Sequence, residues 1–307
     1  MICVLTGLIP SLSLIWAVAW GAVMIISTFY LRKGEFQWLF GINVLIIYFL
    51  GDKSGASFFL LFYGLPALVM SHLSLAGEGY YKLQKWGTIT AVVGVTLFLS
   101  LIYLSAGTEG ITQIQSQINA ELQSALYSGQ NAAILKYYEE KGISREEIEK
   151  TFSLVVSAFT KHLPAFYYLQ AIMAAFFMLI LASWVNLKQR IDRLKKKPFI
   201  KEIMPWQITW VAIAGLLLWM WGQSQNSDLY YVGSNTLVVL VPITAYFGFS
   251  TIMYMVNQRK SGSRNLILAG LIIVTVMFPL SAIIFCSLTG LFDSLMNFRK
   301  FGLKKGE

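Results

Sequence analysis

Charged residues are scarce in this chain, and their scarcity indicates its class. Only 13% of the 307 residues are Asp, Glu, Lys or Arg, whereas 56% are hydrophobic. A water-soluble core cannot bury so large a hydrophobic fraction, so the composition is typical of a membrane protein. The hydrophobic residues form runs near the length that a helix needs to cross a bilayer, and the alternating pattern of a membrane barrel is absent. We therefore predict an all-α, polytopic integral membrane helix bundle of about eight or nine spans.

Cysteine, histidine and the sequence motifs of catalysis are equally rare. Cys3 and Cys286 lie far apart inside apolar runs, which predicts neither a disulfide framework nor a metal site. The chain has no GxxxxGK[ST] phosphate loop, and His72 is the only histidine in an expected span. We therefore expect no enzyme activity, no cofactor and no ATP hydrolysis by the chain itself. The net charge of +9 is attributed to loops that face anionic membrane lipid, and no nucleic-acid partner is expected.

The expected spans themselves contain no Asp, Glu, Lys or Arg. Carriers coupled to protons or sodium usually need ionisable groups near the middle of the bilayer. Uphill transport by this chain would therefore require a partner that supplies energy. The expected spans cover residues 13–31, 36–50, 55–76, 86–106, 164–187, 206–222, 230–256 and 265–291, with a further short apolar piece at residues 1–10.

Lysine and arginine in the short loops are concentrated in alternate loops, with only Lys53 in an opposite one, and this bias predicts the orientation of the chain. Seven of them lie between Lys188 and Lys201, and fourteen lie in the loops that we assign to the cytoplasm. The predicted parts are N-terminal membrane helices at 1–106, an external segment at 107–162, and C-terminal membrane helices at 163–307 with a basic cytoplasmic loop at 188–203.

The external segment is predicted to be helical and amphipathic. Ser144 and Glu147 form a capping-box pattern that opens a helix with an apolar stripe along Ile148, Phe152 and Val155. Two interpretations are open. The segment either rests passively on the membrane surface or forms a lid over an outward-facing cavity.

The C-terminal end poses a problem of orientation, because a basic amphipathic tail at 291–305 follows the last apolar run. As one helix, residues 265–290 would extend ~39 Å, enough to cross the bilayer with tilt. We therefore expect a single crossing that is kinked at Pro279 and leaves the tail outside. Asp293 would then lie at the outer rim of the membrane, either paired locally with Asn297 and Lys300 or bordering an outward pocket.

Two sets of residues are candidates for packing or binding. Close helix packing, or docking of a partner, is expected at the small residues Ala17, Gly21, Ala171 and Ala175. An external aromatic cluster is typical of a membrane-interface belt, but aromatic walls with a few amides also bind flat, neutral ligands. The candidate ligand-binding residues are Trp219, Trp221, Tyr230, Tyr231, Asn235 and Asp293.

Several short sequences occur in an order that resembles a known family. They are "GLIP", "LAGEGYYKLQKWG", "IMPWQITW", "SNTLVVLVPITAYFGF" and "GLFDSLMNFRK". Together they resemble the YybS-like family of uncharacterised bacterial membrane proteins, which is similar to the S components of energy-coupling-factor vitamin transporters. The resemblance implies a multi-pass protein of the bacterial cytoplasmic membrane, with an S-component-like core that runs to about Lys188 and three additional helices after it.

Two classes of function follow from these observations. The first is an S-component-like subunit that binds a small neutral or aromatic molecule and obtains energy from separate coupling ATPase subunits. The second is a non-transporting scaffold that docks other proteins of the cell envelope. The absence of charge inside the spans favours the first, whereas the long external segment and the basic loop fit the second.

Overall fold

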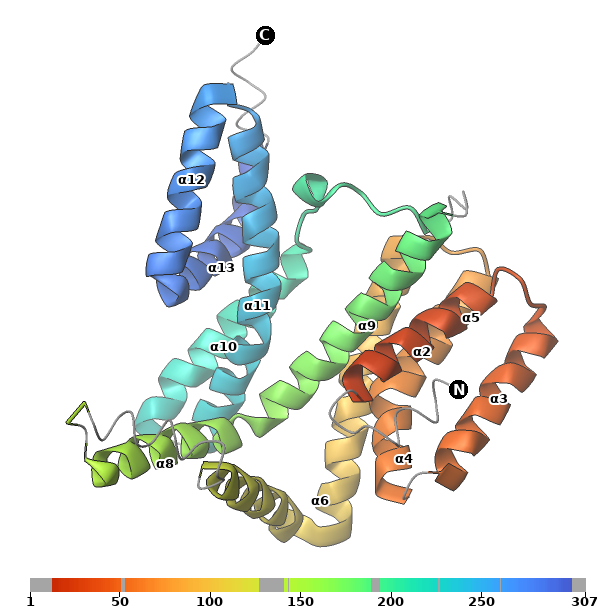
Figure 1. Ribbon diagram of the computed structural model, residues 1–307, viewed down its shortest axis with the longest axis horizontal. Coiled ribbons are helices and arrows are strands. Elements are labelled where there is room, and N and C mark those ends of the chain that lie inside the picture. Colours follow the sequence, from red (N-terminus) through yellow and green to blue (C-terminus); the bar gives the residue numbers. More distant parts are fainter. Residues whose placement is uncertain are drawn as a thin grey trace. The chain divides into compact units, whose positions relative to one another are not determined.

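The structure is a computed structural model that describes residues 13–50, 53–126, 141–142, 144–188, 194–225, 227–259 and 261–299. Over these ranges every regular element is a helix (Figure 1). The chain divides into two compact units, Met1–Lys196 and Lys197–Glu307. This division falls inside the predicted basic loop, close to where the S-component-like part was expected to end.

Unit 1 is built around four helices that pack on one another, α2, α5, α6 and α9. Its described elements are α2 (Ser13–Ser27), α3 (Lys33–Leu50), α4 (Lys53–Phe59), the π-helical turn η2 (Leu60–Gly64), α5 (Leu65–Leu75), α6 (Tyr80–Leu126), α8 (Arg145–Lys161) and α9 (Leu163–Lys188). Thr28, just after α2, is hydrogen-bonded to Ser74 at the end of α5 (2.7 Å), so these two helices end side by side.

The long helix α6 contains a break at Gly107, the residue at which the external segment was expected to begin. Its φ and ψ of 60° and −151° lie in a region that is essentially restricted to glycine. After α6, the predicted capping box is confirmed at the start of α8. The Ser144 hydroxyl accepts the Glu147 N–H, and the Glu147 carboxylate accepts the Ser144 N–H.

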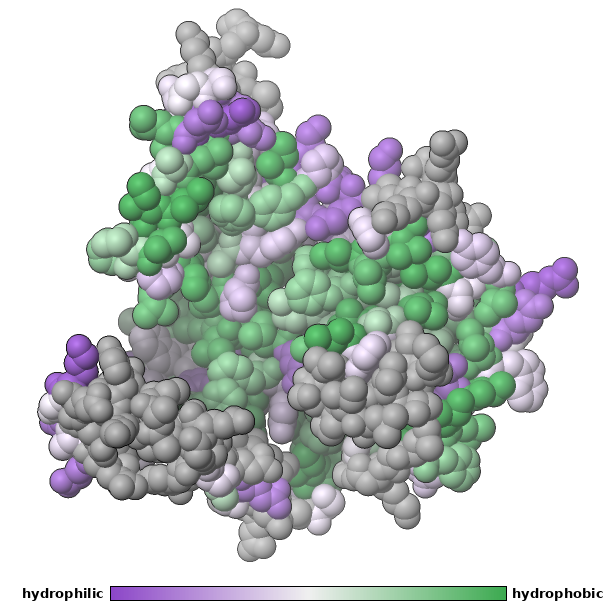
Figure 2. Space-filling view, viewed as in Figure 1, coloured by the Kyte–Doolittle hydropathy of each residue, from purple (hydrophilic) through white to green (hydrophobic). Residues whose placement is uncertain are grey.

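The described part of unit 2 consists of a short 3-10 turn and four helices. They are η4 (Phe199–Lys201), α10 (Trp206–Gln225), α11 (Ser227–Asn257), α12 (Ser261–Met277) and α13 (Pro279–Met296). Helices α10 and α11 form an antiparallel hairpin, because Gly222 lies against Tyr230 and Gly215 against Thr236. Figure 2 shows hydrophobic residues over α12 and hydrophilic ones where α11 turns into α12.

Five described helices are long and apolar enough to cross a membrane. Helical membrane character is therefore confirmed, whereas the expected eight or nine spans are not. By length and composition, the five segments are Gly55–Leu75, Tyr80–Ser105, Leu163–Asn186, Asp228–Asn257 and Pro279–Met296.

The predicted single crossing at residues 265–290 is wrong. The helix breaks at Phe278, whose φ and ψ are −135° and 65°, and α12 and α13 form a hairpin. Helix α13 runs parallel to α11, since Thr244 bonds Ser287 and Thr251 bonds Asp293. Close packing of α11 on α13 stabilises this hairpin. A Cβ on Gly248 of α11 would overlap the backbone of α13, and a Cβ on Gly290 of α13 would overlap the backbone of α11.

The C-terminal end of α13 therefore lies beside the C-terminal end of α11, which leads to Arg259. The expectation that the last helix ends on the opposite side from that basic turn is wrong too. Helix α13 ends at Met296, so the predicted tail helix at 291–305 does not continue as one helix through Asn297. Lys300 and the residues after it lie outside the described residues.

Candidate functional site

A π-helical turn interrupts the membrane-length segment Gly55–Leu75 in unit 1. Leu65 donates its N–H to the Leu60 carbonyl, five residues earlier in the chain. The next residue, Pro66, has no N–H and cannot donate to the Leu61 or Phe62 carbonyl. The missing N–H of Pro66 thus explains why the regular α-helical hydrogen-bond pattern is interrupted here. π-Helical turns are rare in proteins, and many of those that do occur lie at functional sites.

The Leu61 carbonyl faces helix α6 at Gly94. A Cβ at position 94 would overlap the oxygen and carbon of this carbonyl, so glycine alone allows the two backbones to approach this closely. One turn of α6 further on, Phe98 contacts the aromatic residues of the π-helical segment. The π-helical turn and Gly94 therefore position part of an aromatic cluster.

Five aromatic rings from four helical elements form this cluster, with the centroids of contacting rings 4.1 to 6.4 Å apart. Two rings are buried, and the other three are partly exposed. Most pairs are edge-to-face, the geometry that aromatic quadrupoles favour. The members of this ring cluster are Phe58, Phe62, Tyr63, Phe98 and Tyr167.

One amide completes the ring cluster. Gln170 of α9 donates its Nε2–H to the Tyr63 hydroxyl, with a separation of 2.5 Å between nitrogen and oxygen. The Tyr63 O–H hydrogen and the Gln170 carbonyl oxygen remain available, one as a donor and one as an acceptor. The cluster therefore combines aromatic rings with a neutral donor–acceptor pair, which is the chemistry that a flat neutral ligand requires.

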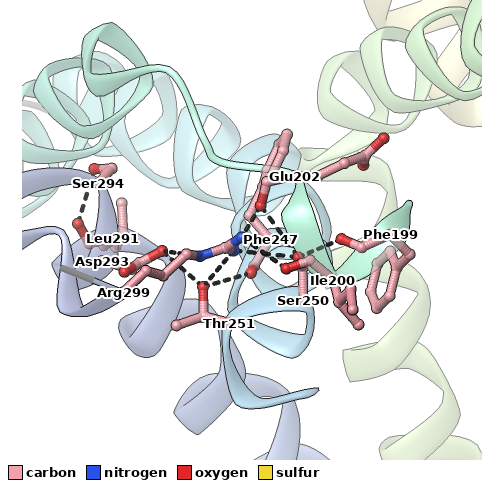
Figure 3. A network of polar contacts seen from close by, with 10 residues as sticks. All are labelled: Phe199, Ile200, Glu202, Phe247, Ser250, Thr251, Leu291, Asp293, Ser294 and Arg299. Carbon is pink, nitrogen blue, oxygen red and sulfur yellow. Dashed lines mark hydrogen bonds and ion pairs between the residues drawn. The ribbon is translucent and has the colours of Figure 1, made fainter. Parts of the chain in front are cut away.

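Unit 2 contains a second candidate, a buried ionic network around Arg299 (Figure 3). Asn297 adopts a left-handed conformation (φ 51°) and donates its N–H to the Asp293 carbonyl, which ends α13 and turns the chain. This turn brings Arg299 back onto Asp293, with 3.2 Å between Nε and Oδ2. Both side chains are buried, at 7% and 4% exposure.

The guanidinium of Arg299 joins three segments of unit 2. It donates to the backbone carbonyls of Ile200 (2.8 Å) and Glu202 (2.6 Å), which precede α10. It also donates to the Thr251 hydroxyl, which itself donates to Asp293 Oδ2 (2.8 Å). Carbonyls in and just after the 3-10 turn η4 are thus satisfied away from water, as an apolar environment requires.

The sequence patterns did not predict this network. They predicted Asp293 at the outer rim of the membrane, and Arg299 fell within the basic amphipathic tail predicted at 291–305. The structure instead buries Asp293 inside α13, within a membrane-length helix, although the spans were expected to contain no charge. Asn297 was the available signal, because asparagine is one of the few residues that adopt the left-handed conformation at a helix end.

The predicted aromatic site in unit 2 is brought together in part. Trp219, Tyr230 and Tyr231 are neighbours, with centroid distances of 6.4 and 5.3 Å. Trp221 points outward and is 63% exposed. The Asn235 amide donates to the Tyr231 carbonyl (2.8 Å).

Two observations argue against a single ligand pocket formed by the predicted binding residues. A Cβ on Gly222 or Gly233 would overlap the backbone of Tyr230 or Trp219, so protein fills the space between α10 and α11 there. Asp293 lies far from them, because its partner Thr251 is roughly 20 residues beyond Tyr231 on α11, or ~30 Å at 1.5 Å per residue.

The four small residues proposed for packing or docking lie in the interior of unit 1. Ala17, Ala171 and Ala175 are buried. A Cβ on Gly21 would overlap the side chain of Met178 in α9. These small residues therefore allow the backbones of α2 and α9 to approach closely.

Membrane-length apolar helices, glycines at close helix contacts and a charged network kept from water define a helical integral membrane protein. The chain belongs to the DUF2232 family, described as predicted membrane proteins, whose model matches residues 1–294. No curated protein and no solved structure matches the chain significantly.

Proposed function

We propose that this protein is a membrane subunit that binds a small, flat, neutral molecule at the ring cluster of unit 1. It has no energy source of its own and acts with separate coupling ATPase subunits. The observation that carries the proposal is the Tyr63–Gln170 hydrogen bond, which lies among aromatic rings beside a π-helical turn.

The chemistry of the cluster favours such a ligand. Ring faces stack on flat molecules, and the few polar groups of an apolar site set the ligand's orientation. Tyr63 supplies a donor and Gln170 an acceptor, which together suit the edge of a heterocyclic amide. Neither the five rings nor Gln170 carries charge, so an ionised ligand would gain no ion pair there.

The position of the cluster also supports the proposal. The rings come from η2, α4, α6 and α9, all within Met1–Lys196. This unit contains the apolar segments that resemble S components of vitamin transporters. A binding role for unit 1 therefore agrees with the resemblance, and unit 2 supplies the additional helices.

Mass spectrometry of the purified protein tests this proposal directly. Wild-type protein extracted gently from cells should release a small neutral molecule, and Tyr63→Phe and Gln170→Leu should each retain about tenfold less, as loss of a buried polar contact of ~1.4 kcal/mol predicts. Tyr168→Phe is the matched control, because its hydroxyl bonds Thr96 and not the cluster.

Two results would contradict the binding role. One is wild-type protein that carries no small molecule under any growth condition tested. The other is equal retention in Tyr63→Phe, Gln170→Leu and the control. Co-purification of envelope proteins without any small molecule would instead favour the scaffold.

A further inference from the structure

Helix α8 is joined to a membrane-length helix by a single residue. It ends at Lys161, His162 follows, and α9 begins at Leu163. Because Leu163–Asn186 is long and apolar enough to cross the bilayer, its first residue lies near one membrane boundary. The C-terminal end of α8 must lie at the same boundary. Figure 1 shows that the chain bends between the two helices, so that α9 rises obliquely away from the line of α8.

One face of α8 is apolar and exposed. Val155 is 61% exposed and Phe159 is 38% exposed, and they continue the stripe that begins at Ile148 and Phe152. Val156 and Thr160, on a neighbouring face, are buried. The opposite face carries Lys150, Ser153 and Lys161, all exposed, with Leu154 among them at 64% exposure. Unit 1 therefore covers one side of α8 and leaves the apolar stripe uncovered.

The stripe is continuous with the first turn of the membrane helix. Phe159 stacks on Phe166 of α9, with ring centroids 4.5 Å apart and an interplanar angle of 28°. A membrane surface that surrounds the start of α9 therefore reaches the side of α8 that carries Phe159. This continuity favours lipid as the occupant of the stripe, ahead of a folded protein partner.

We infer that α8 is an interfacial membrane helix, which lies in the plane of the bilayer surface with Val155 and Phe159 among lipid acyl chains. Amphipathic helices with lysines beside an apolar face bind in this way, with the stripe at the boundary between headgroups and acyl chains. Lys150 and Lys161 can extend their amines toward the headgroups. The Ser144–Glu147 capping box satisfies N–H groups at the end of α8 furthest from α9.

Site-directed fluorescence tests the inference in full-length protein. Val155→Cys and the control Ser153→Cys are made in a background with Cys3→Ser and Cys286→Ser. Each is labelled with an environment-sensitive dye and reconstituted in phosphatidylcholine vesicles. Both native side chains are exposed, so the labels do not disturb a buried contact.

Lipids that carry a quencher on the acyl chain should quench the dye at position 155 at least roughly twofold more than the dye at position 153. Aqueous iodide should show the opposite order. If iodide reaches both positions equally, the stripe faces water and the inference is wrong. If neither quencher reaches position 155, protein covers the stripe, as in a lid or a partner complex, and the inference is also wrong. The result does not depend on whether a ligand binds the ring cluster.

Discussion

Units 1 and 2 each contain backbone that leaves the α-helix in an apolar setting, and they accommodate its carbonyls in opposite ways. In unit 1, Pro66 ends the hydrogen-bond ladder and the Leu61 carbonyl lies against the bare backbone of Gly94. In unit 2, the Ile200 and Glu202 carbonyls accept hydrogen bonds from Arg299. The first arrangement requires the absence of a side chain, whereas the second requires the presence of one.

This difference predicts unequal sensitivity to mutation. At Gly94, a substitution adds one methyl group that overlaps backbone atoms of Leu61, and α6 and the π-helical segment would have to shift apart to admit it. At Arg299, a substitution removes the partner of the buried Asp293 carboxylate, and a buried unpaired charge is among the most unfavourable groups in a protein. The ionic network of unit 2 should therefore be the more fragile of the two.

Replacing Arg299 should have the largest effect on stability. Arg299→Met keeps an unbranched side chain but removes the charge that pairs with Asp293 and one donor to each of two carbonyls, so the free energy of unfolding should fall by about 3–5 kcal/mol. The measurement is denaturant titration in detergent micelles. Arg259→Met is the control, because Arg259 is exposed at the turn after α11.

A second substitution separates loss of charge from loss of packing. Adding Asp293→Asn to Arg299→Met removes the unpaired carboxylate and should restore part of the lost stability, because the two side chains are in direct contact. Equal stability of Arg299→Met and Arg259→Met would show that the network contributes little.

Gly94→Ala should have a smaller effect than Arg299→Met. The new methyl group would overlap the Leu61 carbonyl, so overpacking should lower the free energy of unfolding by about 1–3 kcal/mol. Gly41→Ala in α3 is the control, since a Cβ there meets nothing within 4 Å. The same titration measures both, and a Gly94→Ala protein as stable as its control would refute the tight contact.

Local sequence patterns predicted the helices well but not their partners. The apolar run at 164–187 became α9 at Leu163–Lys188, and the Ser144–Glu147 pattern became a capping box, because short-range polarity and capping determine both. The turn at Phe278 was missed. Length favoured one helix through residues 265–290, whereas packing of Gly290 on Thr244 and Gly248 favours a hairpin.

The candidate sites were also predictable only where their residues are close in sequence. The aromatic residues at 219–231 are close in sequence and were found together, but the close approach of α10 and α11 at Gly222 and Gly233 has no local signature. The pairs Tyr63–Gln170 and Arg299–Ile200 join residues far apart in the chain. Neither could be inferred from spacing, because each depends on how complete helices pack.

The smallest expected change in stability is at Tyr63, and it tests whether the two units differ in function as well as chemistry. Tyr63→Phe removes one neutral hydrogen bond and keeps the ring, so the free energy of unfolding should fall by only about 0.5–1.5 kcal/mol. Thr251→Val in unit 2 removes a hydrogen bond to a carboxylate and should lower it by about 1.5–3 kcal/mol.

Retention of a small molecule should follow the reverse order. Tyr63→Phe should lose most of it, because the hydroxyl is part of the proposed donor–acceptor pair, whereas Thr251→Val should retain it in the folded fraction. Denaturant titration and mass spectrometry on the same preparations give both quantities. If retention instead falls in proportion to stability in both variants, Tyr63 and Gln170 serve packing alone, and the ring cluster is ordinary core.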